Sequence, residues 1–156
     1  MRPFEILSTN HTSFTVSNLE RTLAFFRDGL GFAVTSRAPR DPATIERIVG
    51  VKGADIEVAY VRGPGHSLEL IEYKGPRDKG KVAARPCDTG FAHIAFDVRN
   101  IEAAIAAAEP YGVVPIAPPV LLTRGGPNAG SKVVYLRDPD GITIEFIERP
   151  PSAPER

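Results

Sequence analysis

Two stretches of the chain alternate between polar and apolar residues. Residues 11–17 and 93–98 each place a mainly apolar set on one face of an extended strand and a polar set on the other. Alternation with a period of two is typical of a strand that buries one face. Apolar residues at helical spacing follow each stretch, directly after Asn18 and Asn100, and asparagine is a favourable helix N-cap. The pattern therefore predicts a strand followed by a helix at two places.

Three further apolar runs in each half indicate more strands. They cover about 32–37, 55–62, 67–73, 113–117, 132–137 and 142–148. Gly63-Pro64-Gly65 and Asp138-Pro139-Asp140-Gly141 are turn sequences, and each joins two strands as a hairpin. A short helix is predicted over 42–49, where an aspartate precedes a proline at the start. Residues 117–131, rich in proline and glycine, are predicted to form a loop that could cover a site.

The two halves form an internal repeat. Segments 11–20 and 93–102 share His, Phe, Val, Asn and Glu at the same offsets. The sequence therefore predicts an α+β fold built from two βαβββ modules. Their expected extents are 1–74 for the first module, 75–89 for a linker, 90–149 for the second module and 150–156 for a disordered tail.

Composition narrows the classes of function. Nineteen Lys and Arg balance nineteen Asp and Glu, so the basic footprint of a nucleic-acid or polybasic membrane binder is missing. The sequence contains no apolar run long enough for a membrane-spanning helix and no signal-peptide pattern at its start. A single cysteine, Cys87, excludes an internal disulfide and a Cys-x-x-Cys zinc site. We therefore expect a cytoplasmic protein without nucleic-acid or membrane partners.

The repeat also duplicates a histidine and a glutamate. His11 and His93 point away from the apolar faces of their strands, and Glu69 and Glu145 do the same in theirs. All four side chains can therefore project from the sheet face opposite the helices. Two imidazoles and two carboxylates suit one divalent cation, such as zinc, nickel, cobalt, iron or manganese. One strand histidine alone is usually structural, and it is the duplication that favours a metal site.

Other polar side chains are weaker candidates for binding a substrate. The hydroxyls of Tyr60, Tyr73 and Tyr135 could hydrogen-bond a ligand, although packing is the more ordinary role of a half-buried tyrosine. Arg124, in the proline-rich loop, could meet an anionic group, although a solvated loop arginine is more common. These four residues are therefore the weaker, substrate-binding candidates of the sequence.

The motifs together resemble the vicinal oxygen chelate superfamily, which includes glyoxalase I, methylmalonyl-CoA epimerase, extradiol dioxygenases, and fosfomycin and bleomycin resistance proteins. The resemblance rests on His-x-x-Phe-x-Val-x-Asn-Leu-Glu, Leu-Glu-Leu, His-Ile-Ala-Phe-Asp-Val and Arg-Asp-Pro-Asp-Gly-Ile-x-Ile-Glu, and spans about 8–148. It implies a curved mixed sheet cupped around a metal, with helices on the outer face. It also implies a homodimer, with modules that pair within or between chains.

The resemblance implies a role for each member of the quartet. His11, Glu69, His93 and Glu145 fall on the four ligand positions, in the order of bacterial glyoxalase I. The implied activity is a metal-dependent lyase or isomerase that acts on a small molecule with vicinal oxygens. It abstracts a proton next to a metal-bound carbonyl and passes through an enediolate. Either glutamate could carry the proton, and the sequence alone leaves that choice, the metal and the substrate open.

Two alternatives share the fold. A ring-cleaving dioxygenase would carry histidine in place of Glu69, and His66 cannot serve because a residue three positions away faces the other side of a strand. A non-catalytic drug-binding protein would not need four duplicated ligands. Thr15 and Tyr73 stand where bacterial glyoxalase I has an arginine and an asparagine for glutathione. Related chemistry on a substrate other than a glutathione adduct is therefore implied.

Overall fold

The computed structural model describes residues 3–124 and 126–151, and the chain divides into two units, residues 1–78 and 79–156. The division falls inside the predicted linker 75–89, so the predicted modules 1–74 and 90–149 lie in separate units. Of the tail predicted over 150–156, residues 152–156 lie outside the described residues. Each unit is described by itself below.

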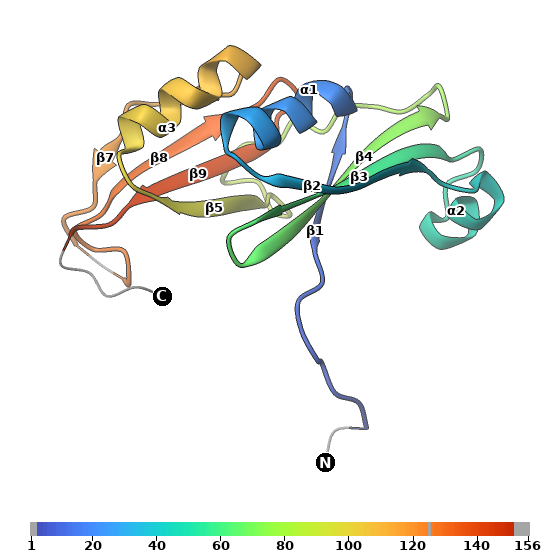
Figure 1. The fold of residues 1–156 in the computed structure, drawn as a ribbon, viewed down its shortest axis with the longest axis horizontal. Coiled ribbons are helices and arrows are strands. Elements are labelled where there is room, and N and C mark those ends of the chain that lie inside the picture. The colour runs from blue at the N-terminus through green and yellow to red at the C-terminus, as the bar shows by residue number, and fades with distance from the viewer. Residues whose placement is uncertain (1–2, 125, 152–156) are drawn as a thin grey trace. The chain divides into compact units, whose positions relative to one another are not determined.

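Unit 1 has the predicted order of one strand, a helix and three strands, with a second helix inserted (Figure 1). Its elements are β1 (Thr12–Val16), α1 (Leu19–Ala24), the π-helical continuation η1 (Phe25–Gly29), β2 (Ala33–Pro39), α2 (Pro42–Val49), β3 (Asp55–Gly63) and β4 (His66–Gly75). The sheet order is β1-β4-β3-β2, with β1 parallel to β4 and the other pairs antiparallel.

Unit 2 repeats this arrangement, with shorter strands after its first helix. Its elements are β5 (His93–Val98), α3 (Ile101–Ala108), the 3₁₀ turn η2 (Glu109–Tyr111), β6 (Val114–Pro115), β7 (Val120–Leu121), β8 (Lys132–Arg137) and β9 (Thr143–Glu148). The sheet order is β5-β9-β8-β6, with β5 parallel to β9, and β7 also pairs with β8. The predicted α+β fold with two mixed sheets is confirmed. The loop prediction for 117–131 is wrong at β7, whose two residues pair with Val133 and Lys132 of β8.

The first helix of each unit starts as the asparagines predict. Asn18 Oδ1 accepts a hydrogen bond from the backbone N–H of Arg21 at 2.9 Å, and Asn100 Oδ1 accepts one from Ala103 at 3.0 Å. A glutamate from the last strand adds a second acceptor at both helix starts. These bonds run from Leu19 N–H to Glu72 and from Asn100 N–H to Glu148, both at 2.7 Å. Each helix is thereby tied to the strand that carries the predicted glutamate ligand.

Alternation along the last strand of each unit places a carboxylate on the face opposite fully buried apolar side chains, although in β9 Thr143 and Ile147 on the carboxylate face are buried as well. In β4, Leu68 and Leu70 are fully buried and Glu69 is only partly so. In β9, Ile144 and Phe146 are fully buried on either side of Glu145. Burial of these apolar side chains supplies the main stabilising term of each unit, and it fixes the direction of each glutamate.

Helix α2 packs on the other face of the first sheet from α1. Its buried residue Ile45 joins Ile56 and Val58 of β3, and the half-buried rings of Tyr60 and Tyr73 pack against this cluster. The register pairs Tyr60 with Glu69, so the cluster shares the face of the carboxylate. The expectation of helices only on the outer face therefore fits α1 but not α2. Helix α2 is amphipathic, with Ile48 exposed, and it adds apolar surface to the sheet face that carries the Glu69 carboxylate.

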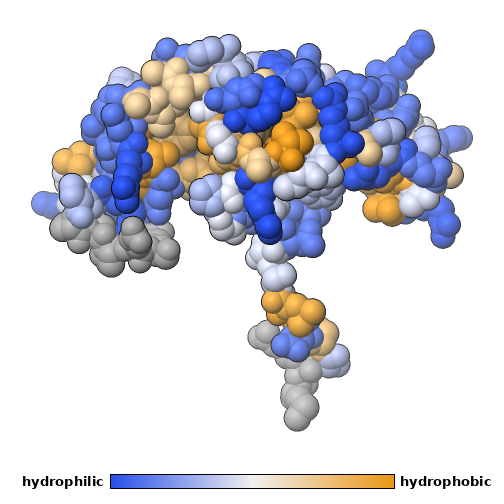
Figure 2. Space-filling model, viewed as in Figure 1, coloured by the Kyte–Doolittle hydropathy of each residue, from blue (hydrophilic) through white to orange (hydrophobic). Residues whose placement is uncertain are grey.

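The N-terminal segment is extended and apolar. Phe4, Ile6 and Leu7 are 63%, 76% and 85% exposed, and this segment protrudes from the body of unit 1 (Figure 2). Among the described residues, no helix is long and apolar enough to cross a membrane.

Candidate functional site

The parallel pairing of β1 with β4 brings His11 to Glu69. Ser13 lies opposite Glu69 in the register, and His11 is two residues earlier, on the same face of the sheet. The imidazole Nε2 lies 3.2 Å from Glu69 Oε2, and the two side chains are 30% and 15% exposed. Two predicted ligands from distant parts of unit 1 are thus in contact and open to solvent.

Unit 2 repeats this contact through β5 and β9. Ala95 lies opposite Glu145, and His93, two residues before Ala95, is again on the carboxylate face. His93 Nε2 lies 3.1 Å from Glu145 Oε2, and the side chains are 33% and 14% exposed. The distances and exposures of the two pairs agree closely, as a duplicated site requires.

Within each unit the candidate ligands come together only as pairs. Among the described residues, no three His, Cys, Asp or Glu side chains form a cluster that could hold a metal ion. The structure thus gives two donors per unit. Joint binding of one ion by His11, Glu69, His93 and Glu145 stays a prediction.

A hydrogen bond to Asn10 orients the imidazole of His11 at the first pair. His11 Nδ1 lies 2.7 Å from Asn10 Oδ1, and because an amide oxygen only accepts, Nδ1 carries the proton. In a neutral imidazole, Nε2 then presents a lone pair to the carboxylate oxygen at 3.2 Å. This orientation lets Nε2 and the carboxylate oxygen serve as neighbouring donors to one cation. A hydrogen bond on the far ring nitrogen is also the usual way in which a ligating histidine is oriented.

Tyr60 completes the first pair from the neighbouring strand. It lies opposite Glu69 in the β3–β4 register, and its hydroxyl donates to Glu69 Oε1 at 2.5 Å. Its ring meets His11 edge-on, with centroids 5.5 Å apart. The hydrogen bond to the carboxylate, with burial and the negative charge of Glu69, raises the pKa of Tyr60 above its ordinary value. The hydroxyl therefore keeps its proton and acts as a donor.

Tyr135 holds the equivalent place in unit 2 but contacts the imidazole. It lies opposite Glu145 in the register, yet its oxygen is 3.4 Å from His93 Nε2. The ring centroids of Tyr135 and His93 are 4.9 Å apart, and Phe91 stacks on the imidazole at 6.1 Å. Burial, followed by the charge of Glu145, raises the pKa of Tyr135.

The remaining candidates occupy other positions in their units. Tyr73 packs against the α2 cluster, opposite Ile56 in the register. Thr15 is an exposed residue of β1, and neither Thr15 nor Tyr73 carries a positive charge. Arg124 is exposed in the segment between β7 and β8. Cys87 is exposed, with its sulfur 4.0 Å from Asp88 Oδ1.

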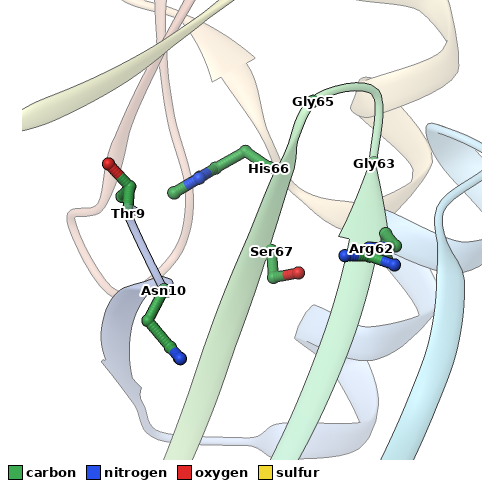
Figure 3. A pocket seen from close by; sticks show the side chains of 7 residues that line it. All are labelled: Thr9, Asn10, Arg62, Gly63, Gly65, His66 and Ser67. Carbon is green, nitrogen blue, oxygen red and sulfur yellow. The ribbon is translucent and has the colours of Figure 1, made fainter. Parts of the chain in front are cut away.

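A shallow pocket of about 300 Å³ lies at the β3–β4 hairpin (Figure 3). Its lining residues are Thr9, Asn10, Arg62, Gly63, Gly65, His66 and Ser67. Figure 3 shows His66 projecting from β4 toward the Thr9–Asn10 segment, and its Nε2 lies 2.8 Å from the Thr12 hydroxyl. His66 thus belongs to a different contact from Glu69. Asn10, which the sequence analysis did not single out, links this pocket to His11.

Comparisons with known proteins show the family and the fold of this chain. Residues 8–146 match the family model of the Glyoxalase/Bleomycin resistance protein/Dioxygenase superfamily. A 2-epi-5-epi-valiolone epimerase from Actinomyces sp is 32% identical over 154 residues, which cover 95% of this chain and 82% of that protein. A lactoylglutathione lyase from Haemophilus influenzae is 30% identical over 145 residues, covering 88% and 90%. A solved glyoxalase family protein from Bacillus cereus has a TM-score of 0.77 at 22% identity and covers 95% of this chain and 97% of that one.

Proposed function

Because this chain belongs to the Glyoxalase/Bleomycin resistance protein/Dioxygenase superfamily, we propose that it is a metal-dependent lyase or isomerase of the glyoxalase I type. The reaction would move a proton at a carbon atom next to a carbonyl group. One observation carries the proposal: each unit holds an imidazole Nε2 within 3.2 Å or less of a carboxylate oxygen, at matching positions of a duplicated fold. Partly exposed His–Glu pairs contribute little to stability, so their presence at matching positions of both units favours a role in binding.

The donor set fits a divalent metal ion. His11, Glu69, His93 and Glu145 would hold it, as nitrogen and oxygen donors that suit zinc, nickel, cobalt, iron or manganese. The two pairs would serve the same ion, within one chain or across two copies of it. When bound, the cation supplies Lewis-acid stabilisation of the negative charge that develops on a substrate carbonyl oxygen.

Glu145 is the better placed of the two carboxylates to move a proton. Both oxygens of Glu69 have partners, because Tyr60 donates to Oε1 and His11 lies beside Oε2. The carboxylate of Glu145 contacts only His93 among the described side chains, through Oε2. Glu145 can therefore turn toward a substrate proton and return it to the neighbouring carbon, while Glu69 stays in place.

The substrate we propose is a small molecule with vicinal oxygens and no glutathione group. Exposed Thr15 and packed Tyr73 offer no cation to a glutathione carboxylate. The face beside Glu69 is instead bounded by the apolar α2 cluster, which includes Ile56 and Ile45. An uncharged or compact carbonyl compound fits such a face better than a charged tripeptide adduct. The relative named as an epimerase is consistent with proton transfer without glutathione.

A homodimer is part of the proposal. Phe4, Ile6 and Leu7 are each more than 60% exposed on the N-terminal segment, and a second copy would cover this apolar surface. Light scattering on the purified protein should then give twice the chain mass.

Deuterium exchange tests the proposed reaction. The protein would be loaded in turn with each of the five metals and incubated in deuterated water with α-hydroxy ketones, thioesters and hemithioacetals. We expect metal-dependent incorporation of deuterium next to a carbonyl, detected by NMR and abolished by a chelator. Failure of every loaded form to exchange a proton on any of these classes would refute the proposal.

A further inference from the structure

The two units place a tyrosine at the same point but use its hydroxyl differently. Tyr60 and Tyr135 both lie on the strand beside the glutamate, directly opposite it in the register. The hydroxyl of Tyr60 donates to Glu69, whereas that of Tyr135 lies nearest to His93. Because the two tyrosines occupy equivalent positions but their hydroxyls have different partners, the two units are expected to have different roles.

In unit 1 the carboxylate is held from both sides. Tyr60 donates to Glu69 Oε1 at 2.5 Å, and Oε2 is left toward His11 at 3.2 Å. A hydroxyl bond to an ionised carboxylate is among the stronger hydrogen bonds in proteins. It takes up one oxygen and fixes the rotation of the group, so that only the other oxygen is offered to a cation.

Tyr60 is itself anchored by packing. Its ring rests on the cluster formed by Ile45, Ile56 and Val58, and its edge meets His11. A phenol fixed in this way does not need to be ordered when a ligand binds. Groups that orient a metal ligand in advance typically affect metal affinity 10–100-fold.

In unit 2 the carboxylate lacks this restraint. The Tyr135 oxygen is 3.4 Å from His93 Nε2 and forms no hydrogen bond to Glu145 among the described residues. Glu145 therefore lacks the hydroxyl hydrogen bond that Glu69 receives in unit 1.

We propose that Tyr60 is a positioning residue that holds Glu69 as a fixed, single-oxygen ligand, and that Tyr135 has no such role. The inference rests on the proposed function and deepens it, because it explains how one glutamate stays a ligand while its counterpart is free to move. Tyr60 acts through Glu69 and is not itself expected to touch the substrate.

The test compares Tyr60→Phe with the matched variant Tyr135→Phe, using cobalt(II) alone as the probe. We expect Tyr60→Phe to bind cobalt(II) at least about tenfold more weakly than wild type. Its visible cobalt absorption should also change, because a freed carboxylate coordinates differently. Tyr135→Phe removes a hydroxyl that contacts an imidazole and not a carboxylate, so its loss of cobalt(II) affinity should be smaller than that of Tyr60→Phe. Circular dichroism checks that both variants fold, a readout that loss of one hydroxyl should leave unaltered.

A double-variant cycle with Glu69→Gln shows whether the tyrosine acts through the glutamate. Glu69→Gln/Tyr60→Phe should bind cobalt(II) no more weakly than Glu69→Gln alone. Wild-type affinity and spectrum in Tyr60→Phe, equal losses in both tyrosine variants, or additive losses in the cycle would each overturn the role of Tyr60 alone. A wild-type protein that binds no cobalt(II) would instead overturn the proposed function, and the role of Tyr60 with it.

Discussion

Replacing Glu145 by glutamine, assayed at saturating metal, separates proton transfer from folding and metal binding. The substitution keeps the size of the side chain and an oxygen that can face His93, but it removes the group that can accept a proton. Glu145 lies between the buried residues Thr143 and Ile147 of its own face, and because glutamine has nearly the same volume, the packing of β9 should change little. Glu69→Gln is the matched control, because it makes the same chemical change in the equivalent place of unit 1.

The expected size of the effect follows from the role assigned to each carboxylate. A positioned general base contributes about 10²–10⁴-fold to rate, or about 3–5 kcal/mol of activation free energy at 1.36 kcal/mol for each factor of ten. Glu145, with His93 as its single described side-chain contact, should lose that full amount. Glu69, held by Tyr60, should lose metal affinity but less than about tenfold in rate once metal is saturating.

Deuterium exchange at saturating metal measures both losses on one scale. The concentration of metal is raised until the rate no longer increases, which removes differences in metal affinity. A Glu145→Gln rate within about tenfold of wild type would contradict the assignment of the base. Equal large losses of rate in the two glutamine variants would show that both carboxylates take part in proton transfer, and would contradict the separate roles assigned to Glu145 and Glu69.

Two further predictions concern stability. Phe146 is 0% exposed, so Phe146→Ala should lower the free energy of unfolding by about 3–5 kcal/mol in urea titrations. A loss below about 1 kcal/mol would show that Phe146 is not part of the core of unit 2. Hydrogen bonds from the Thr44 hydroxyl and backbone N–H to the N-cap Asp41 lower its pKa, so the unfolded chain takes up a proton at that carboxyl more readily than the folded one. The stabilisation from this cap is therefore fully present above the ordinary pKa of the carboxyl group, and it is lost as the pH falls through the lowered pKa of the folded state. The difference in urea midpoint between wild type and Asp41→Asn should accordingly shrink when the pH is reduced from about 7 to below about 4. A difference that does not vary with pH would contradict the role of the charge.

Much of the fold could be predicted because local signals and the repeat agree. The helix predicted over 42–49 is α2 (Pro42–Val49), bounded by a capping aspartate, a proline and Gly50 with a positive φ of 68°. Strand β7 was missed because two paired residues leave no periodic pattern, and both of its side chains are exposed. The side of the sheet that α2 covers also depends on tertiary packing of Ile45, which no local pattern reveals.

Some contacts of the candidate site could likewise be predicted from the sequence, and others could not. Strand alternation was enough to place His11 and Glu69 on one face, because both strands bury their other face. The contact of Tyr60 with Glu69 could have been found by counting from the turn. Gly63 pairs with His66 across Pro64-Gly65, so each step back along β3 meets one step forward along β4. The bond from His11 to Asn10 depends on the conformation of a segment before β1 and had no such signal.

The central claim, that the two His–Glu pairs serve one cation, is tested most directly by counting metal. Elemental analysis of the purified, metal-loaded protein should give one divalent ion per chain. His11→Ala and His93→Ala should each abolish tight binding, because each would remove a ligand of the same ion. Two ions per chain, or one pair that still binds tightly after loss of the histidine in the other, would contradict the account.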